Sequence, residues 1–238
     1  MNNVRTLSDT KRAFYTYHTR PINSIYRRVV EEIMVEMHLL SVNVDFRYDP
    51  IYGLGVVSAY EQFMQGYAPE ADKVSIFKAI CQSIEDDPQR YQEDARRLEE
   101  LVQTLSEADL IASLSQPDNL ATPQLLREIV SAIAQNPKFK YSRLFAIGLY
   151  SLLEKASAAG LQDEKQRNDT LKQVSTALHL PEEKLQKDLE LYRSNLEKMA
   201  QARIVMEDAL QAERKKREQR EQQRAAANSP SETPPSES

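Results

Sequence analysis

Apolar residues recur along most of this chain at intervals of three and four positions, which is the spacing of one face of an α-helix. The pattern is clearest after Pro21, where it includes Ile22, Ile25, Tyr26, Val29, Val30, Ile33, Met37 and Leu40. It predicts an amphipathic helix of about five turns that begins near Pro21. The opposite face of this helix carries four charged residues, Arg27, Arg28, Glu31 and Glu32.

The same spacing predicts more helices, over about residues 50–65, 72–85, 88–105, 123 onward, 141–159 and 163–178. Three of the predicted starts place a capping side chain directly before a proline, at Asp49, Asp87 and Thr122. Gly66 and Gly160 are expected to end helices. No segment alternates in the manner of a strand, so the predicted fold class is all-α, a single helical domain.

The pattern changes after Pro181, where a narrower apolar stripe with heptad spacing begins. The stripe consists of Leu185, Leu189, Tyr192, Leu196, Met199, Arg203, Met206 and Leu210, with Arg203 as its one charged position. It predicts a long, coiled-coil-like C-terminal helix of about 65 Å over residues 181–224. The predicted organisation is a helical core domain over residues 1–180, this helix, and a disordered tail over residues 225–238.

Composition narrows the functional classes. The chain has 238 residues with 5 glycines and no tryptophan, which favours helices, and its net charge of −5 gives no general attraction for nucleic acid. One cysteine rules out an internal disulfide and suits a reducing compartment. No signal peptide is visible, and the strongest apolar run, residues 144–153, is about half of what spans a bilayer. The sequence therefore predicts a protein without a transmembrane segment, soluble or peripheral on a membrane.

Several residues that could carry chemistry have simpler interpretations. Gly53-Leu54-Gly55 lacks the third glycine of a phosphate-binding loop, and close helix packing or local flexibility explains the pair better. His38 would belong to a di-iron motif only if a glutamate stood at position 35, which is Val35.

The cysteine and the acidic pair before Pro88 also have structural interpretations. Cys81 falls on an apolar helix face, which indicates a buried thiol. Asp86 and Asp87 are expected to cap a helix rather than to act as an acid/base pair. No catalytic, cofactor-binding or metal-binding residue is therefore predicted, and the chain is not expected to be an enzyme.

Two surfaces are candidates for binding a partner. One is the charged face of the helix after Pro21, with Arg27, Arg28, Glu31 and Glu32; the other is the distal part of the C-terminal helix, with Arg203, Met206 and Leu210. The aromatic residues Phe14, Tyr15 and Tyr17 are expected to anchor a short first helix on the core.

Three classes of function remain open on these grounds. The first is an interaction protein, which binds a partner through one or both of these surfaces. The second is a helical enzyme, which the missing chemistry disfavours. The third is a basic-tailed helical protein that binds an anionic membrane surface or nucleic acid through residues 213–224, which hold six basic and three acidic residues.

Three stretches together resemble a known family: SDTKRAFYTYHTRPINSIYRRVVEEIMVEMHLLSVNVDFRYDPIYGLGVVSAYEQFMQGY, IFKAICQSIEDDPQRY and YSRLFAIGLYSLLE. In this order they are similar to the thylakoid formation protein family, also described as a photosystem II biogenesis factor of cyanobacteria and chloroplasts. The resemblance covers about residues 1–215.

The resemblance implies an all-helical, non-enzymatic accessory protein on the cytoplasmic or stromal side of the thylakoid membrane. As partners it implies an FtsH-type membrane protease complex and the photosystem II assembly and repair machinery. Peripheral membrane association fits the resemblance. The net charge gives no reason to expect a nucleic-acid partner, and the incomplete motifs give none to expect a cofactor.

Overall fold

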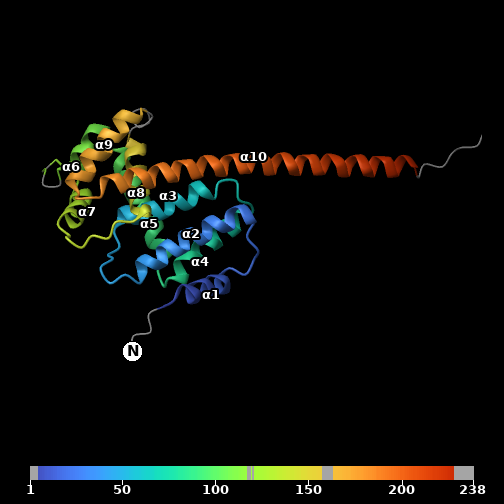
Figure 1. Ribbon diagram of the computed structural model, residues 1–238, viewed down its shortest axis with the longest axis horizontal. Helices are drawn as coiled ribbons and strands as arrows, with labels where there is room; N and C mark the ends of the chain where they lie inside the picture. The colour runs from blue at the N-terminus through green and yellow to red at the C-terminus, as the bar shows by residue number, and fades with distance from the viewer. Residues whose placement is uncertain (1–4, 117–118, 120, 157–162, 228–238) are drawn as a thin grey trace, which may run out of the picture. The chain divides into compact units, whose positions relative to one another are not determined.

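The computed structural model describes residues 5–116, 119, 121–156 and 163–227, and in this part of the chain it contains ten α-helices and no strand (Figure 1). The helices are α1 (Leu7–Tyr17), α2 (Ser24–Ser41), α3 (Pro50–Phe63), α4 (Glu70–Ser83), α5 (Pro88–Gln103), α6 (Glu107–Ser115), α7 (Gln124–Ala134), α8 (Arg143–Ala156), α9 (Glu164–Ala177) and α10 (Glu182–Ala227). The chain divides into two compact units, Met1–Leu196 and Glu197–Ser238. The predicted all-α fold class is confirmed.

Capping chemistry explains where several helices begin. The Asp49 side chain accepts a hydrogen bond from the backbone N–H of Tyr52 at 2.9 Å, and Asp87 accepts one from Gln89 at 2.9 Å, so both predicted caps are confirmed. The prediction for Thr122 was wrong, because α7 follows Pro123 without a side-chain cap.

The prediction that the second helix begins at Pro21 was also wrong. Helix α2 begins at Ser24, and its cap is Asn23, whose amide oxygen accepts from the Ile25 N–H at 3.1 Å. Pro21 lies before it, exposed and outside any helix. The short side chain of Asn23 satisfies a backbone donor that Pro21 cannot, which sets the start three residues later.

The core of the first unit is built on the crossing of α3 and α8. A side chain at Gly55 would overlap the carbonyl oxygen of Leu144, and one at Gly148 would overlap that of Ile51. The two backbones touch at this point because neither residue has a Cβ. Gly55 therefore serves close helix packing, whereas Gly53 leaves room for the Tyr48 side chain, and helix α8 is buried along nearly its whole length.

Helix α1 is attached to α2 and α4 by buried polar contacts. The Thr10 hydroxyl lies 2.9 Å from Nδ1 of His38 on α2, and the Ser75 hydroxyl of α4 lies 3.0 Å from Nδ1 of His18. Phe14 anchors α1 in the core as predicted. Tyr15 and Tyr17 are exposed, so the prediction that all three aromatic residues anchor this helix was wrong for these two.

The remaining predictions concern one further helix, two glycines at helix ends and the C-terminal tail. Helix α6, capped by the Ser106 hydroxyl, was missed because its apolar stripe is short. Gly66 has a φ of 75°, the left-handed conformation that glycine adopts readily after a helix end. Gly160 lies outside the described residues. So do residues 228–238 of the predicted disordered tail, whereas residues 225–227 belong to α10.

The predicted long C-terminal helix is present as α10. Within the first unit its stripe is buried at Leu185, Leu189 and Tyr192, and the Tyr192 ring packs edge-on against Phe63 with centroids 5.6 Å apart. The first unit therefore includes the start of α10, up to Leu196. The predicted division at residue 180 stays a prediction.

Candidate partner-binding site

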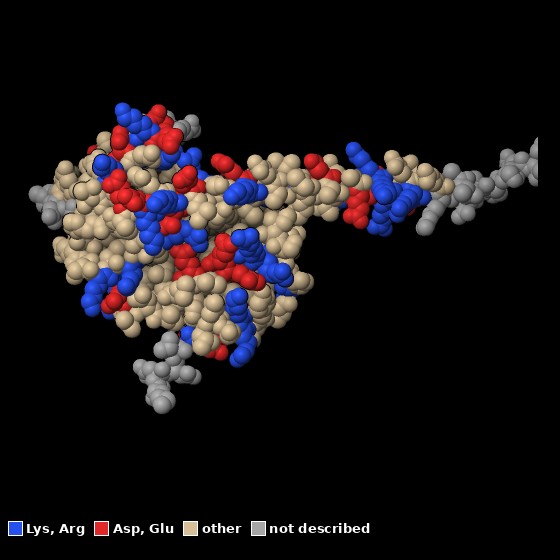
Figure 2. All heavy atoms as spheres, viewed as in Figure 1, with Lys and Arg blue, Asp and Glu red and all other residues tan. Residues whose placement is uncertain are grey.

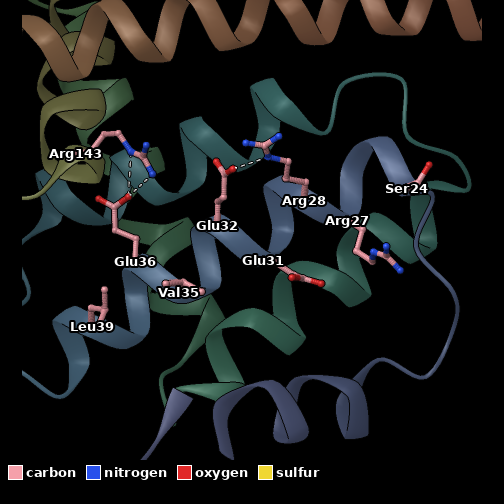
Figure 3. Close-up of a pocket in the computed structure, with 9 residues that line it drawn as sticks. All are labelled: Ser24, Arg27, Arg28, Glu31, Glu32, Val35, Glu36, Leu39 and Arg143. Atoms are coloured by element: carbon pink, nitrogen blue, oxygen red, sulfur yellow. Dashed lines mark hydrogen bonds and ion pairs between the residues drawn. The ribbon is translucent and has the colours of Figure 1, made fainter. Parts of the chain in front are cut away.

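Helix α2 has one buried face and one polar face, as its spacing predicts. Tyr26, Val30, Met34 and Met37 are buried against the core, while the opposite side forms a pocket of about 560 Å³. The pocket is lined by Ser24, Arg27, Arg28, Glu31, Glu32, Val35, Glu36, Leu39 and Arg143 (Figure 3). We call it the α2 pocket; all of its residues come from α2 except Arg143, which begins α8.

Glu36 joins the α2 pocket to α8. Its carboxylate accepts two hydrogen bonds from the Arg143 guanidinium at 2.9 and 3.1 Å, and one from the backbone N–H of Leu144 at 3.1 Å. The Glu36 and Arg143 side chains are only 17% and 32% exposed. The carboxylate thus pairs an arginine and satisfies a free N–H in the first turn of α8, where the helix dipole also favours negative charge.

The other two glutamates of the α2 pocket also have partners within the protein. Glu32 accepts from Nε of Arg28 at 3.0 Å, an ion pair between positions four apart on the same helix. Glu31 lies 3.6 Å from the Lys11 ammonium and accepts from the Tyr15 hydroxyl at 3.3 Å, both on α1. Partial burial, and then the nearby Glu31 carboxylate, raise the pKa of Tyr15, so the phenol keeps the proton that it donates.

Two residues of the α2 pocket present groups to solvent. Arg27 is exposed and makes no ion pair with any residue that the structure describes. Leu39 is 60% exposed although it is a large apolar residue on an ordered helix. Figure 2 shows Lys or Arg and Asp or Glu side chains interspersed over this part of the molecule. The α2 pocket thus places one exposed apolar side chain beside several charged ones on the same surface.

The structure brings together four of the seven predicted surface residues. Arg27, Arg28, Glu31 and Glu32 line the α2 pocket. Arg203, Met206 and Leu210 lie on α10 in the second unit, where Leu210 is exposed and the other two are half-buried. Ile204 and Val205 of the same unit are more exposed than Leu210.

Sequence reasoning missed five residues of this site, Ser24, Val35, Glu36, Leu39 and Arg143. A signal existed for Val35 and Leu39, because they follow Arg27 and Glu31 at steps of four and so share their side of the helix. No local signal could identify Arg143, which is separated from Glu36 by 107 positions.

The residues considered for chemistry have structural roles. Cys81 is fully buried, and burial raises the pKa of its thiol, which keeps it protonated and unreactive. Asp87 caps α5, and Asp86 pairs with Arg90 at 2.6 Å and accepts from the Tyr91 hydroxyl. His38 is buried and bonded to Thr10.

Within the described ranges, no group of three or more His, Cys, Asp or Glu residues is arranged to hold a metal ion. No described helix combines the length and the apolar character needed to cross a membrane.

A family model described as "Thylakoid formation protein" matches residues 6–221. The chain belongs to the thylakoid formation protein family. Two relatives, each a Protein Thf1, come from Trichormus variabilis and Nostoc punctiforme and are 61% and 60% identical over 230 residues. Both alignments cover 97% of this chain, and 99% and 98% of the respective relatives.

A solved structure also supports membership of this thylakoid formation protein family. A structure of Psb29 at 1.55 Å superposes with a TM-score of 0.77 at 46% identity, covering 90% of this chain and 98% of that one. The family resemblance predicted from the sequence is confirmed, and so is the helical architecture.

Proposed function

We propose that this protein is a non-catalytic accessory factor of photosystem II biogenesis and repair, and of thylakoid membrane formation, which acts by binding an FtsH-type membrane protease complex. Membership of the thylakoid formation protein family supports the setting. The α2 pocket supports binding as the mode of action. It places the exposed Leu39 beside charged side chains, of which Glu31 and Glu36 are held by residues of α1 and α8, so that a partner meets apolar and polar groups on one fixed surface.

The roles of the buried polar groups support an accessory rather than a catalytic protein. A general base or nucleophile needs a reactive group that is accessible in a cleft. Cys81, His18 and His38 are instead buried in the core of the first unit, and both histidines are hydrogen-bonded to hydroxyls across helix contacts. These three groups are therefore part of the core packing and are not presented in a cleft.

The distal part of α10 supplies a second, weaker contact in this proposal. Leu210 is exposed there, together with Ile204 and Val205. We place the protein on the cytoplasmic or stromal side of the thylakoid membrane, peripheral to it, where the free thiol of Cys81 stays reduced.

A pull-down from detergent-solubilised photosynthetic membranes tests the proposal. The full-length chain is expected to capture the protease complex, identified by mass spectrometry. Leu39→Asp is expected to abolish the capture, because it places a charge where an apolar contact forms. Leu191→Asp is the matched control: Leu191 is a helical leucine, 45% exposed, outside the α2 pocket. Equal capture by both variants would contradict the proposed docking surface.

A second candidate function is binding of an anionic membrane surface by the distal α10 helix. The observation that favours it is the run Arg214, Lys215, Lys216 and Arg217, all four exposed. Its test is cosedimentation of the full-length chain with vesicles of anionic phospholipid. Binding that falls steeply with added salt would support it, and binding to neutral vesicles alone would contradict it.

A further inference from the structure

The α2 pocket has different chemistry at its two ends. Arg27, Glu31, Val35 and Leu39 follow one another at steps of four along the pocket side of α2, as Figure 3 shows. The stripe begins with a cation, one turn after Ser24 at the start of the helix, and ends with two aliphatic side chains. The N-terminal end of a helix also carries a partial positive charge, so this end favours a negative group.

The middle of the α2 pocket offers no unpaired charge. Its three carboxylates are held by cations of the protein itself: Glu31 by Lys11, Glu32 by Arg28, and Glu36 by Arg143. A partner would have to break one of these pairs to bind there. The groups that remain for a partner are therefore the Arg27 guanidinium at one end and the aliphatic surface of Val35 and Leu39 at the other.

The distance from Arg27 to the aliphatic end of the α2 pocket sets the spacing that the binding groups of a partner must have. At a rise of about 1.5 Å per residue, Val35 lies roughly 12 Å and Leu39 roughly 18 Å along the helix from Arg27. A helix lying alongside α2 covers the same lengths with about 8 and 12 of its own residues. On such a helix, residues about 7 or 8 positions apart share one face, and so do residues about 11 positions apart. One face of a single helix can therefore meet both spacings to within about one residue.

A helical partner suits the surface better than an extended one. The α2 pocket is lined by side chains of two α-helices, whose backbone groups bond within each helix beyond its first turn, and the described residues contain no strand edge. An extended segment would lose water from its backbone N–H and C=O groups without gaining partners, whereas a helix pairs its own.

We infer that the α2 pocket binds an amphipathic α-helix of the partner protein, which places an Asp or Glu carboxylate on Arg27 and large apolar side chains on Val35 and Leu39. This inference rests on the proposed function and names the part of the partner that the pocket accepts. The carboxylate and the apolar residues lie on one face of that helix, about two to three turns apart.

Photocrosslinking tests the inference with the full-length chain in solubilised photosynthetic membranes. Benzoylphenylalanine replaces Ser24 in one variant and Leu39 in another, so that Arg27 keeps its charge. The expected crosslinks fall in one helical segment of one partner subunit, about 15 residues apart. An Asp or Glu should lie within one turn of the site linked from position 24, and a large apolar residue within one turn of the site linked from position 39.

Three outcomes would overturn the inference: linked sites in different subunits, linked sites fewer than about 8 residues apart as an extended segment would give, or a linked segment without a carboxylate near position 24. The absence of a crosslink from both positions, while the chain still captures the complex, would overturn both the inference and the proposed docking surface.

Affinity measurements separate the inference from the proposed function. Arg27→Glu is expected to weaken binding of the purified protease complex about tenfold, and Arg27→Lys about twofold, because the reversed charge repels the partner carboxylate. The loss with Arg27→Glu should shrink as salt is added. If Leu39→Asp abolishes binding while Arg27→Glu leaves it unchanged, the docking surface stands and the acidic helix is wrong. If neither variant affects binding, the proposed docking surface is wrong as well.

Discussion

Two helices of this protein carry faces of mixed charge, α2 over residues 27–36 and α10 over residues 213–221, but different partners hold these charges. On α2, residues of α1 and α8 hold Glu31 and Glu36. On α10, the pair between Arg217 and Glu221 at 3.1 Å joins positions four apart on one helix, and both side chains are largely exposed. The difference teaches that similar charge patterns can produce a surface held by other helices or one whose charges pair only within their own helix, depending on contacts distant in sequence.

The largest expected effect comes from breaking the helix crossing that places α8, and with it Arg143, beside α2. Gly148→Val puts a branched side chain against the carbonyl oxygen of Ile51, so we expect a loss of about 3 kcal/mol or more in the free energy of unfolding. Urea denaturation followed by circular dichroism measures it. Ala132→Val, at an exposed position of α7, is the control and should change stability by less than about 1 kcal/mol. Similar stabilities for the two variants would disprove the close crossing.

Removing the Glu36 carboxylate, which joins α2 to α8, should cause the next largest loss in the free energy of unfolding. Glu36→Ala leaves the half-buried Arg143 guanidinium and the Leu144 N–H without their partner, and we expect a loss of about 2 kcal/mol. Glu32→Ala removes an exposed pair of the same pocket and should lose less than about 0.5 kcal/mol. Equal losses would mean that the α2 surface is no more fixed than that of α10.

The contact of α1 with α2 and α4 should weaken in acid. Burial lowers the pKa of His38, with a further contribution from Arg5. Burial also lowers the pKa of His18, where Arg20 acts in the same direction and Asp72 in the opposite one. Since the folded protein holds both imidazoles neutral, their contribution to stability is complete above the ordinary value of about 6.5 and declines as the pH falls below it.

The double variant His18→Gln, His38→Gln isolates this pH dependence. Thermal unfolding of both proteins between about pH 5 and pH 8 should show a smaller decline toward acid in the variant. Asp49 does not disturb the comparison: burial raises its pKa to about 7, but it titrates in both proteins. Identical pH profiles would show that the histidines do not control how α1 is held.

Changes in the second unit are expected to have the smallest effect on stability. Truncation after Ala202 removes most of this unit, and we expect an unchanged melting temperature because the first unit contains the buried part of α10. Arg217→Ala in the full chain should change stability by less than about 0.5 kcal/mol. A truncated protein that unfolds or aggregates would show that the distal helix stabilises the first unit.

The parts of this structure that were predictable are those set by residues close in sequence. Asp49 and Asp87 each cap a helix whose first residue is a proline, and both starts followed from two adjacent residues. The start of α2 was misplaced because it was assigned to Pro21 alone, whereas the helix is capped by Asn23, whose side chain accepts a backbone N–H.

The α2 pocket was predictable only in part. The polar face of α2 followed from helical spacing, and the same spacing could have identified Leu39. The pairing of Glu36 with Arg143 could not be predicted, because it depends on how α3 and α8 cross at Gly55 and Gly148. Tertiary packing therefore decides which charged face of this protein is held in place by other helices.

The central claim is that the α2 pocket is the main docking surface and the distal helix a secondary one. Its most direct test is titration of the purified FtsH-type complex with three proteins: the full chain, the full chain with Leu39→Asp, and the chain truncated after Ala202. We predict that Leu39→Asp weakens binding more than about tenfold and that truncation weakens it only about twofold to fivefold. Loss of binding on truncation, together with full affinity for Leu39→Asp, would contradict the claim and place the docking surface on the distal part of α10.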